Sequence, residues 1–285
     1  MKIFDFLLSV IIYFRFNNFK KMKKFLQIGN GVALVSTIFI NYLSNTGAIN
    51  NTTIGERSDG INSLFTPAGY AFSIWGLIYL MLFAFAIFQG RSLFNKDKQD
   101  DFVEKVGIWF IVSCLANIAW VFLWLYGFTG ISCIAMFVML FSLIQIILRN
   151  RMEIWDAPAE IIAFLWWPFV VYAGWISVAS IANVSTYLIE INWDRFGLSA
   201  QTWTIIMIII ATILNILVVI KRNLREFATV GIWALIAIAV KNFEIETYIA
   251  YVAIGGAIII SIVAGYQGFK NRKSNPFLKM MQGRS

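Results

Sequence analysis

The chain has 285 residues, of which 60% are hydrophobic, 16% aromatic and only 13% charged, and its net charge is +8. This composition excludes an ordinary soluble globular protein. The sequence also lacks the even ten-residue alternation of a membrane barrel, so we expect an all-α fold, a polytopic transmembrane helix bundle.

The chain begins with an N-terminal basic segment, residues 1–27. Its apolar stretch at 3–14 is too short to cross a bilayer, and we expect it to lie in the membrane interface. The basic cluster follows this stretch instead of preceding it, which disfavours a cleaved signal peptide. Translation could begin at Met1 or at Met22.

About eight apolar stretches follow, each near the ~20 residues that a spanning helix needs. The predicted spans are 28–46, 67–89, 106–126, 130–148, 159–188, 201–220, 227–243 and 247–266. A basic tail, 267–285, ends the chain.

The Lys and Arg residues test this topology independently. If the N-terminus is cytoplasmic, all but three of the 23 cations fall in cytoplasmic segments, and the exceptions are Arg57, Arg195 and Lys241. This pattern predicts an even number of spans with both termini cytoplasmic. Anionic lipid explains the positive charge, so we expect membrane lipid as a partner and no nucleic acid. The frequent use of Ile, Asn, Lys and Phe is typical of an AT-rich bacterial genome and predicts a bacterial inner membrane protein, with an organellar membrane as the alternative.

The residues available for catalysis are few. The sequence has no histidine, which excludes or nearly excludes membrane di-iron oxygenases, imidazole-ligated haem proteins and most zinc proteases. Glu160 is the one carboxylate inside a predicted span, and Cys114 and Cys133 both lie in apolar helices. We therefore expect no metal site and no disulfide, and no residue set supports an enzyme.

Aromatic and amide side chains are the distinctive feature. Three predicted helices carry rows of them at spacings that share one helix face. The rows are Phe72, Trp75 and Tyr79; Asn117, Trp120 and Trp124; and Tyr172, Trp175, Ala179 and Asn183. Aromatic belts at the membrane surface are the alternative, but belt residues lie at helix ends, whereas these rows reach the interior of their spans. Buried amides also need partners, which favours an inward orientation.

These rows resemble motifs of the TspO/translocator protein family, the tryptophan-rich sensory proteins or peripheral benzodiazepine receptors. The resemblance covers 28–190 and rests on Pro-Ala-Gly-Tyr-Ala-Phe from Pro67, on Asn117 with Trp120, and on W-x-x-x-A-x-x-x-N from Trp175. The family usually has Pro-Pro where this chain has Pro67-Ala68. The resemblance implies a five-helix bundle at 28–190, to which 191–266 adds three transmembrane helices.

The resemblance also implies an aromatic pocket for a planar apolar ligand such as a porphyrin, although no cofactor is certain. We expect Phe72, Trp75, Tyr79, Asn117, Trp120, Tyr172, Trp175 and Asn183 to bind it. The two amides would either hold ligand carboxylates or join helices. We expect Pro67 to start its helix and Gly69 to admit a neighbouring backbone. The loop at 47–66 either covers the pocket or is simply solvated.

The predicted function is a membrane receptor or sensor for a planar hydrophobic ligand. The alternative is a secondary transporter of a hydrophobic small molecule, completed by the three added helices, although the two halves show no inverted repeat. A purely structural role is a third alternative. The ligand, the role of the added helices and the oligomeric state, including a homodimer, stay open at this point.

Overall fold

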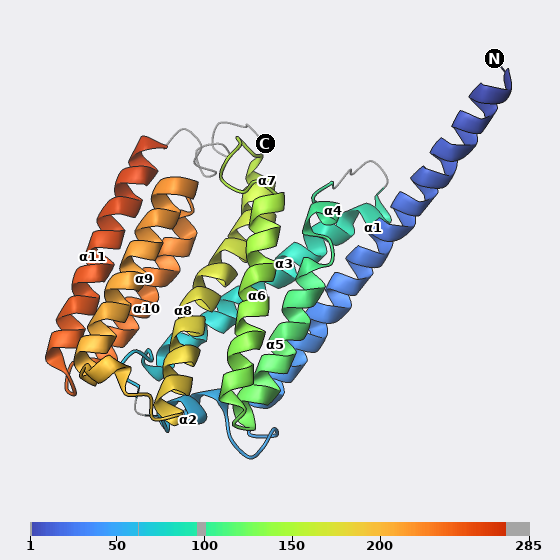
Figure 1. Ribbon diagram of the computed structural model, residues 1–285. Helices are drawn as coiled ribbons and strands as arrows, with labels where there is room; N and C mark the ends of the chain where they lie inside the picture. Colours follow the sequence, from blue (N-terminus) through green and yellow to red (C-terminus); the bar gives the residue numbers. More distant parts are fainter. Residues whose placement is uncertain (1, 62, 96–100, 272–285) are drawn as a thin grey trace.

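Figure 1 shows the protein as a computed structural model that describes residues 2–61, 63–95 and 101–271, with side chains from Lys21 onward. All secondary structure in these ranges is helical. The elements are α1 (Lys2–Ser44), α2 (Ile54–Asp59), the 3-10 helix η1 (Gly69–Ser73), α3 (Ile74–Phe94), α4 (Phe102–Val106), α5 (Trp109–Leu125), α6 (Thr129–Arg149), α7 (Ala159–Ile161), the π-helix η2 (Ile162–Trp166), α8 (Trp167–Glu190), η3 (Arg195–Gly197), α9 (Ala200–Arg222), α10 (Arg225–Asn242) and α11 (Thr247–Lys270).

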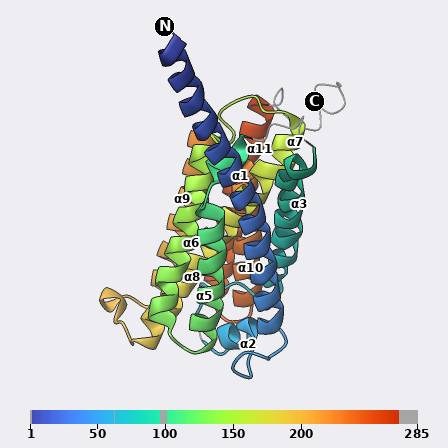
Figure 2. The same cartoon turned by 90° about the vertical axis from the view of Figure 1, so that its right-hand side faces the viewer.

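The long helices α1, α3, α5, α6, α8, α9, α10 and α11 alternate in direction through one bundle (Figures 1 and 2). Within the described residues, six segments are long and apolar enough to cross a membrane. The other two long helices are α5, a shorter apolar helix, and α10, whose 18 residues include Arg225, Glu226 and Lys241. The predicted polytopic helical bundle is confirmed.

Most helix ends follow the hydropathy pattern, but three features do not. α1 is one continuous helix from Lys2, so there is no break where the basic segment was expected to end. Gly107, at φ 56°, separates α4 from α5. The π-helix η2 precedes Pro168, because proline has no N–H for the helical ladder and its ring crowds the carbonyl one turn earlier.

Helix α10 braces the chain that leads into α3. The Ala68 N–H donates to the Ala237 carbonyl (3.1 Å), and the Trp233 indole donates to the Ala71 carbonyl (3.2 Å). A second proline at Ala68, as in the family's Pro-Pro pair, could not donate the first of these bonds. Helix α10 thus holds the start of α3 through the Ala68 N–H, a donor that the family's Pro-Pro pair lacks at this position.

Two expectations for this segment are wrong. Pro67 does not begin the helix, because η1 starts at Gly69 after the extended Ala68. A side-chain carbon added at Gly69 would lie 3.7 Å from Asp59 Oδ2, an ordinary contact, so Gly69 admits no close backbone. The two hydrogen bonds to α10 instead stabilise the non-α-helical segment before α3, from Ala68 through η1.

Close packing of α9 against its neighbours depends on two glycines. The Asn215 amide occupies the space where Gly231 of α10 has no side chain, and a carbon added there would lie 2.3 Å from Asn215 Oδ1. Gly256 of α11 likewise faces Thr212, at 2.6 Å. Small residues that let backbones approach are the usual means of association between helices in a membrane. The three C-terminal helices are therefore one packed unit.

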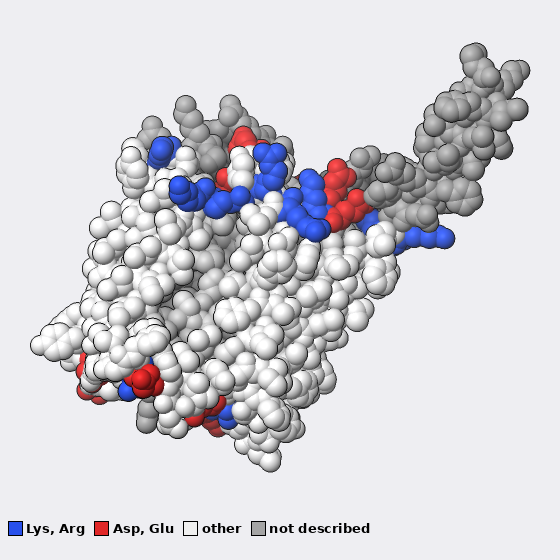
Figure 3. All heavy atoms as spheres, in the orientation of Figure 1, with Lys and Arg blue, Asp and Glu red and all other residues white. Residues whose placement is uncertain are grey.

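Lys and Arg gather at one end of the molecule, and the opposite end has fewer charges (Figure 3). The start of α1 and the end of α11 both lie on the Lys/Arg-rich side (Figure 1). α2 lies across the opposite end of the bundle (Figure 2). The arrangement agrees with an even number of crossings, and the orientation relative to the cytoplasm stays a prediction.

Candidate ligand-binding site

A cavity lies between α3, α5 and α8 at the end of the bundle that α2 covers. Its walls carry four tryptophans from three helices: Trp75, Trp120, Trp124 and Trp175. The other lining residues are Ile54, Ser58, Thr66, Pro67, Phe72, Val178, Ala179, Ala182, Asn183 and Thr186. Trp175 is 2% exposed and Trp120 is 5% exposed, so neither ring faces lipid. The aromatic rows therefore turn inward, to one site.

The rings contact one another in defined orientations. Trp75 stacks on Tyr79 with centroids 5.4 Å apart and meets Trp175 edge-on at 6.4 Å. Phe72 meets Trp175 edge-on at 5.8 Å. Edge-to-face and offset-stacked contacts are the favourable geometries for aromatic pairs. These contacts fix ring faces and edges along the cavity wall.

Beneath the cavity, Asn117 joins α5 to two other helices. Its side-chain oxygen accepts a hydrogen bond from Asn41 Nδ2 of α1 (2.7 Å), and its Nδ2 donates to the Tyr172 hydroxyl of α8 (3.3 Å). The Tyr172 hydroxyl also contacts Met139 Sδ of α6, at 3.0 Å. Asn117 was expected either to hold a ligand carboxylate or to join helices, and its side chain joins helices here.

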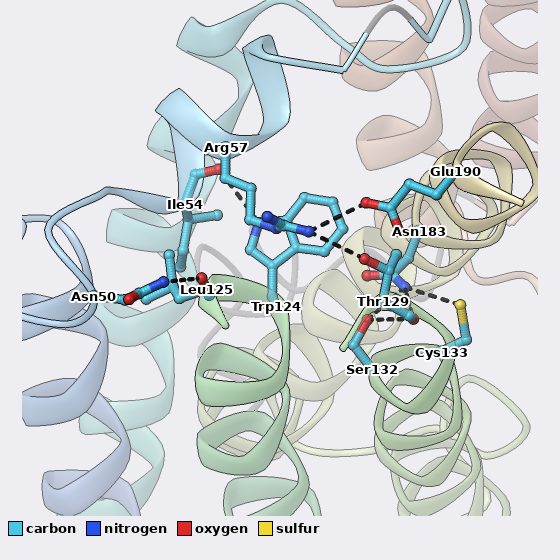
Figure 4. A network of polar contacts seen from close by, with 10 residues as sticks. All are labelled: Asn50, Ile54, Arg57, Trp124, Leu125, Thr129, Ser132, Cys133, Asn183 and Glu190. Atoms are coloured by element: carbon cyan, nitrogen blue, oxygen red, sulfur yellow. Dashed lines mark hydrogen bonds and ion pairs between the residues drawn. The ribbon is translucent and has the colours of Figure 1, made fainter. Parts of the chain in front are cut away.

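Asn183 has the same role on the cavity wall. Its side-chain oxygen accepts from the Trp120 indole N–H (3.0 Å), and its Nδ2 lies within bonding distance of Ser132 Oγ (2.8 Å) and Cys133 Sγ (2.9 Å), as Figure 4 shows in part. These bonds connect α8 to α5 and α6. Because both ends of the amide are engaged, a ligand would have to displace a helix contact to reach it.

The short helix α2 closes the outer mouth. Its first turn carries a capping box, in which Glu56 N–H donates to Thr53 Oγ1 and Thr53 N–H donates to Glu56 Oε2. The Trp124 indole donates to the Ile54 carbonyl at 3.4 Å, so a cavity tryptophan also holds the cover. In the described part of 47–66, Ile54, Ser58 and Thr66 thus line the cavity, so this part lies over its mouth.

Arg57 attaches α2 to the rim on its other side (Figure 4). Its guanidinium pairs with Glu190 at the end of α8 (3.1 Å), donates to Thr129 Oγ1 (3.3 Å) and lies 5.5 Å from the centre of the Trp124 ring. The ion pair is partly exposed to solvent, and such pairs contribute about 0–1 kcal/mol. The cover is therefore held by weak bonds at an accessible edge.

Two polar groups on the cavity walls have no hydrogen-bond partner. The indole nitrogens of Trp75 and Trp175 are buried, and no acceptor contacts them among the described residues. The buried Tyr79 hydroxyl, on the ring stacked against Trp75, also has none in that part of the chain. Buried donors are nearly always satisfied by protein, water or a ligand. These groups could donate to an acceptor that enters the cavity.

Five of the residues predicted to bind the ligand line the cavity: Phe72, Trp75, Trp120, Trp175 and Asn183. Tyr79, Asn117 and Tyr172 lie in the packed layer next to it. The missed residues include Trp124, which belonged to the predicted row of Asn117 and Trp120, and Thr186, one turn beyond Asn183. Trp124 needed only to be included from its own row, and extending the row of Asn183 by one helical turn could have found Thr186.

The missed cover residues, Ile54 and Ser58, come from α2, outside the predicted membrane spans. A signal for α2 exists in the sequence, because Thr53 and Glu56 have the spacing of a capping box. Within the described ranges, no group of three or more His, Cys, Asp and Glu side chains could hold a metal ion.

The family model described as TSPO-like protein matches residues 27–266. No curated protein and no solved structure matches the chain. The match continues through α9, α10 and α11, beyond the 28–190 segment that carries the recognisable motifs. Because it covers most of the chain, this polytopic membrane protein belongs to the TSPO-like protein family.

Proposed function

We propose that the protein is a membrane receptor or sensor that binds a planar hydrophobic ligand with polar edges, such as a tetrapyrrole, in the aromatic cavity. The observation that supports this most directly is the convergence of four tryptophans from α3, α5 and α8 on one site. Flat indole walls offer large stacking area at low conformational cost, which suits a flat apolar molecule.

The polar groups of the site restrict the chemical class of the ligand further. Trp75 and Trp175 bring two indole N–H donors without acceptors, so a ligand with carboxylate or carbonyl oxygens at its edge would satisfy them. Asn117 and Asn183 already have partners and are less suited to this task. Since the chain has no histidine, a porphyrin would bind metal-free or without an imidazole axial ligand.

The size of the cavity requires it to open. Its volume is about 40 Å³, close to that of one water molecule, whereas sites for ligands of this size measure roughly 300–1,000 Å³. Displacement of α2 would enlarge the site, because Ile54 and Ser58 form its outer wall. In this proposal, ligand entry exchanges the contacts of the cover for contacts with the ligand.

Fluorescence titration of the purified protein in detergent with protoporphyrin IX tests the proposal. We expect saturable quenching of tryptophan emission, and an affinity about tenfold weaker in Trp75→Phe or Trp175→Phe, since each loses a hydrogen bond and stacking area while keeping a ring. Trp109→Phe is the matched control, because Trp109 contacts Phe141 and Arg149 away from the cavity.

Equal affinity in all three variants would contradict binding at this site. Haem, sterols and quinones in the same assay define the ligand class. Concentration of the ligand inside sealed vesicles by the wild-type protein would favour the alternative, a secondary transporter.

A further inference from the structure

A second hollow lies on the outer face of the bundle, between α6 and α9, with α8 as its floor. Figure 3 shows this face, with a hollow below the Lys/Arg-rich end. Its volume is about 320 Å³. The lining residues are Leu140, Ile144, Ile147, Leu148, Ala173, Ser177, Val178, Ile181, Ala211, Leu214, Asn215, Val218, Arg222, Leu224 and Phe227. We name this hollow the α6–α9 groove.

The α6–α9 groove is apolar along nearly all of its length. Ala173, Val178 and Ala211 form a buried floor, while Leu148 and Leu214 are about half exposed on its two walls. On α9, the lining residues run from Ala211 to Arg222, along the C-terminal half of the helix. A continuous aliphatic channel of this depth matches a lipid acyl chain better than a flat aromatic molecule, since Phe227 supplies the one aromatic ring in it.

At the Lys/Arg-rich end of the groove lies the Arg222 guanidinium. Its Nε and Nη2 atoms are buried, and they have no hydrogen-bond partner in the described part of the chain. The neighbouring Asn223, not Arg222, donates to Glu153 Oε2 (3.1 Å). A guanidinium stays charged in proteins, and leaving its buried N–H donors without an acceptor costs free energy. An anion at this end of the groove would remove that cost.

We propose that the α6–α9 groove binds one anionic phospholipid from the leaflet at the Lys/Arg-rich end. Its phosphate pairs with Arg222, and one acyl chain lies along the floor of Ala173, Val178 and Ala211. Charge complementarity selects an anionic headgroup, because the Arg222 guanidinium is cationic and two of its nitrogens have no hydrogen-bond partner among the described residues. The apolar length of the groove selects a lipid over free phosphate. The groove shares Val178 with the aromatic cavity but lies on the outer face of the bundle, and the proposal does not depend on a ligand in that cavity.

Native mass spectrometry of the full-length protein from detergent, titrated with phosphatidylglycerol and with phosphatidylcholine, tests the proposal. We expect one phosphatidylglycerol retained in preference to phosphatidylcholine, and binding weakened about tenfold in Arg222→Gln, the size of a lost charged hydrogen bond. The matched control is Lys221→Gln, which removes the same charge from the next residue outside the groove, and we expect less than about a twofold change.

A second pair of variants tests the apolar channel without changing charge. Leu214→Trp adds bulk on the groove wall, whereas Leu217→Trp adds the same bulk at an exposed position of α9 outside the groove. We expect the first to reduce phosphatidylglycerol retention and the second to leave it unchanged. Equal effects within either pair would overturn the proposal. So would displacement of the lipid by inorganic phosphate, because the acyl chain would then contribute nothing.

Discussion

The Trp120 indole N–H donates a 3.0 Å hydrogen bond to the side-chain oxygen of Asn183, and this bond joins α5 to α8 at the wall of the aromatic cavity. Both residues are almost fully buried, so neither group could find water if the bond broke. The site is therefore built from groups that also hold the bundle together. Altering them changes the free energy of unfolding as well as the cavity.

A double-mutant cycle measures this bond. Asn183→Ala leaves the Trp120 N–H and the Ser132 hydroxyl without their shared partner, and we expect it to lower the free energy of unfolding by about 1–3 kcal/mol. Trp120→Phe removes the donor together with the pyrrole part of the buried indole ring. We expect a coupling of about 0.5–2 kcal/mol between the two changes in thermal or denaturant unfolding in detergent. Additive effects would show that the bond contributes nothing to stability.

Opening of the cover depends on Arg57. Arg57→Gln removes the ion pair with Glu190 and the charge beside Trp124, which should raise the open population up to about fivefold. The measurement is maleimide labelling of a Ser58→Cys reporter, because Ser58 lies on the cavity wall and is buried when α2 is closed.

Arg195→Gln is the control for this experiment. Arg195 has the same charge and lies at the same end of the molecule, but its Nε donates to the nearby Leu198 carbonyl instead of to the cover. Faster labelling in Arg57→Gln alone supports the cover. Equal labelling rates in both variants would show that Arg57 does not hold it.

Hydropathy and aromatic spacing were sufficient to predict the helices and the inward rows. Most helix ends agree within a few residues because burying backbone in a bilayer requires internal hydrogen bonds. The exception is α1, which begins at Lys2, well before the predicted start at 28. Trp75, Trp120 and Trp175 were assigned to the interior by their depth in the spans, and all three line one cavity.

The partners of these side chains could not be predicted. Whether Asn183 meets Trp120 or a ligand depends on the rotation and height of α8 relative to α5, which helical periodicity on each helix does not determine. The same holds for Gly69 and Gly231. Gly69 begins η1 and Gly231 lies within α10, yet of the two only Gly231 has a neighbour, Asn215, in the place of its missing side chain.

Ala68 tests the link between α10 and the start of α3. Its φ of −57° and ψ of 147° suit proline, so Ala68→Pro removes the N–H bond to Ala237 with little backbone strain. We expect a loss of about 1 kcal/mol, partly offset by the stiffer unfolded chain. Ala68→Ser keeps the N–H and should unfold as the wild type does. If the proline variant is as stable as the serine variant, α10 does not brace α3 through this bond.

Gly231 provides the sharpest test of the C-terminal helices. Gly231→Ala places a carbon within 2.8 Å of the oxygen, carbon and nitrogen of the Asn215 amide, so α9 and α10 must separate or the amide must move. Overpacking of this kind costs about 1–3 kcal/mol. Gly255→Ala on α11 is the control, since no atom lies within 4 Å of the added carbon and alanine favours helix.

The Gly231 variant also has a defined rescue. Asn215→Ala shortens the side chain that the new methyl group meets, so the double variant Gly231→Ala/Asn215→Ala should recover most of the lost thermal stability in detergent. Recovery shows that the amide and the glycine share one space between α9 and α10. If the double variant is less stable than Gly231→Ala alone, the methyl group disturbs some other contact, and the three C-terminal helices do not pack as described.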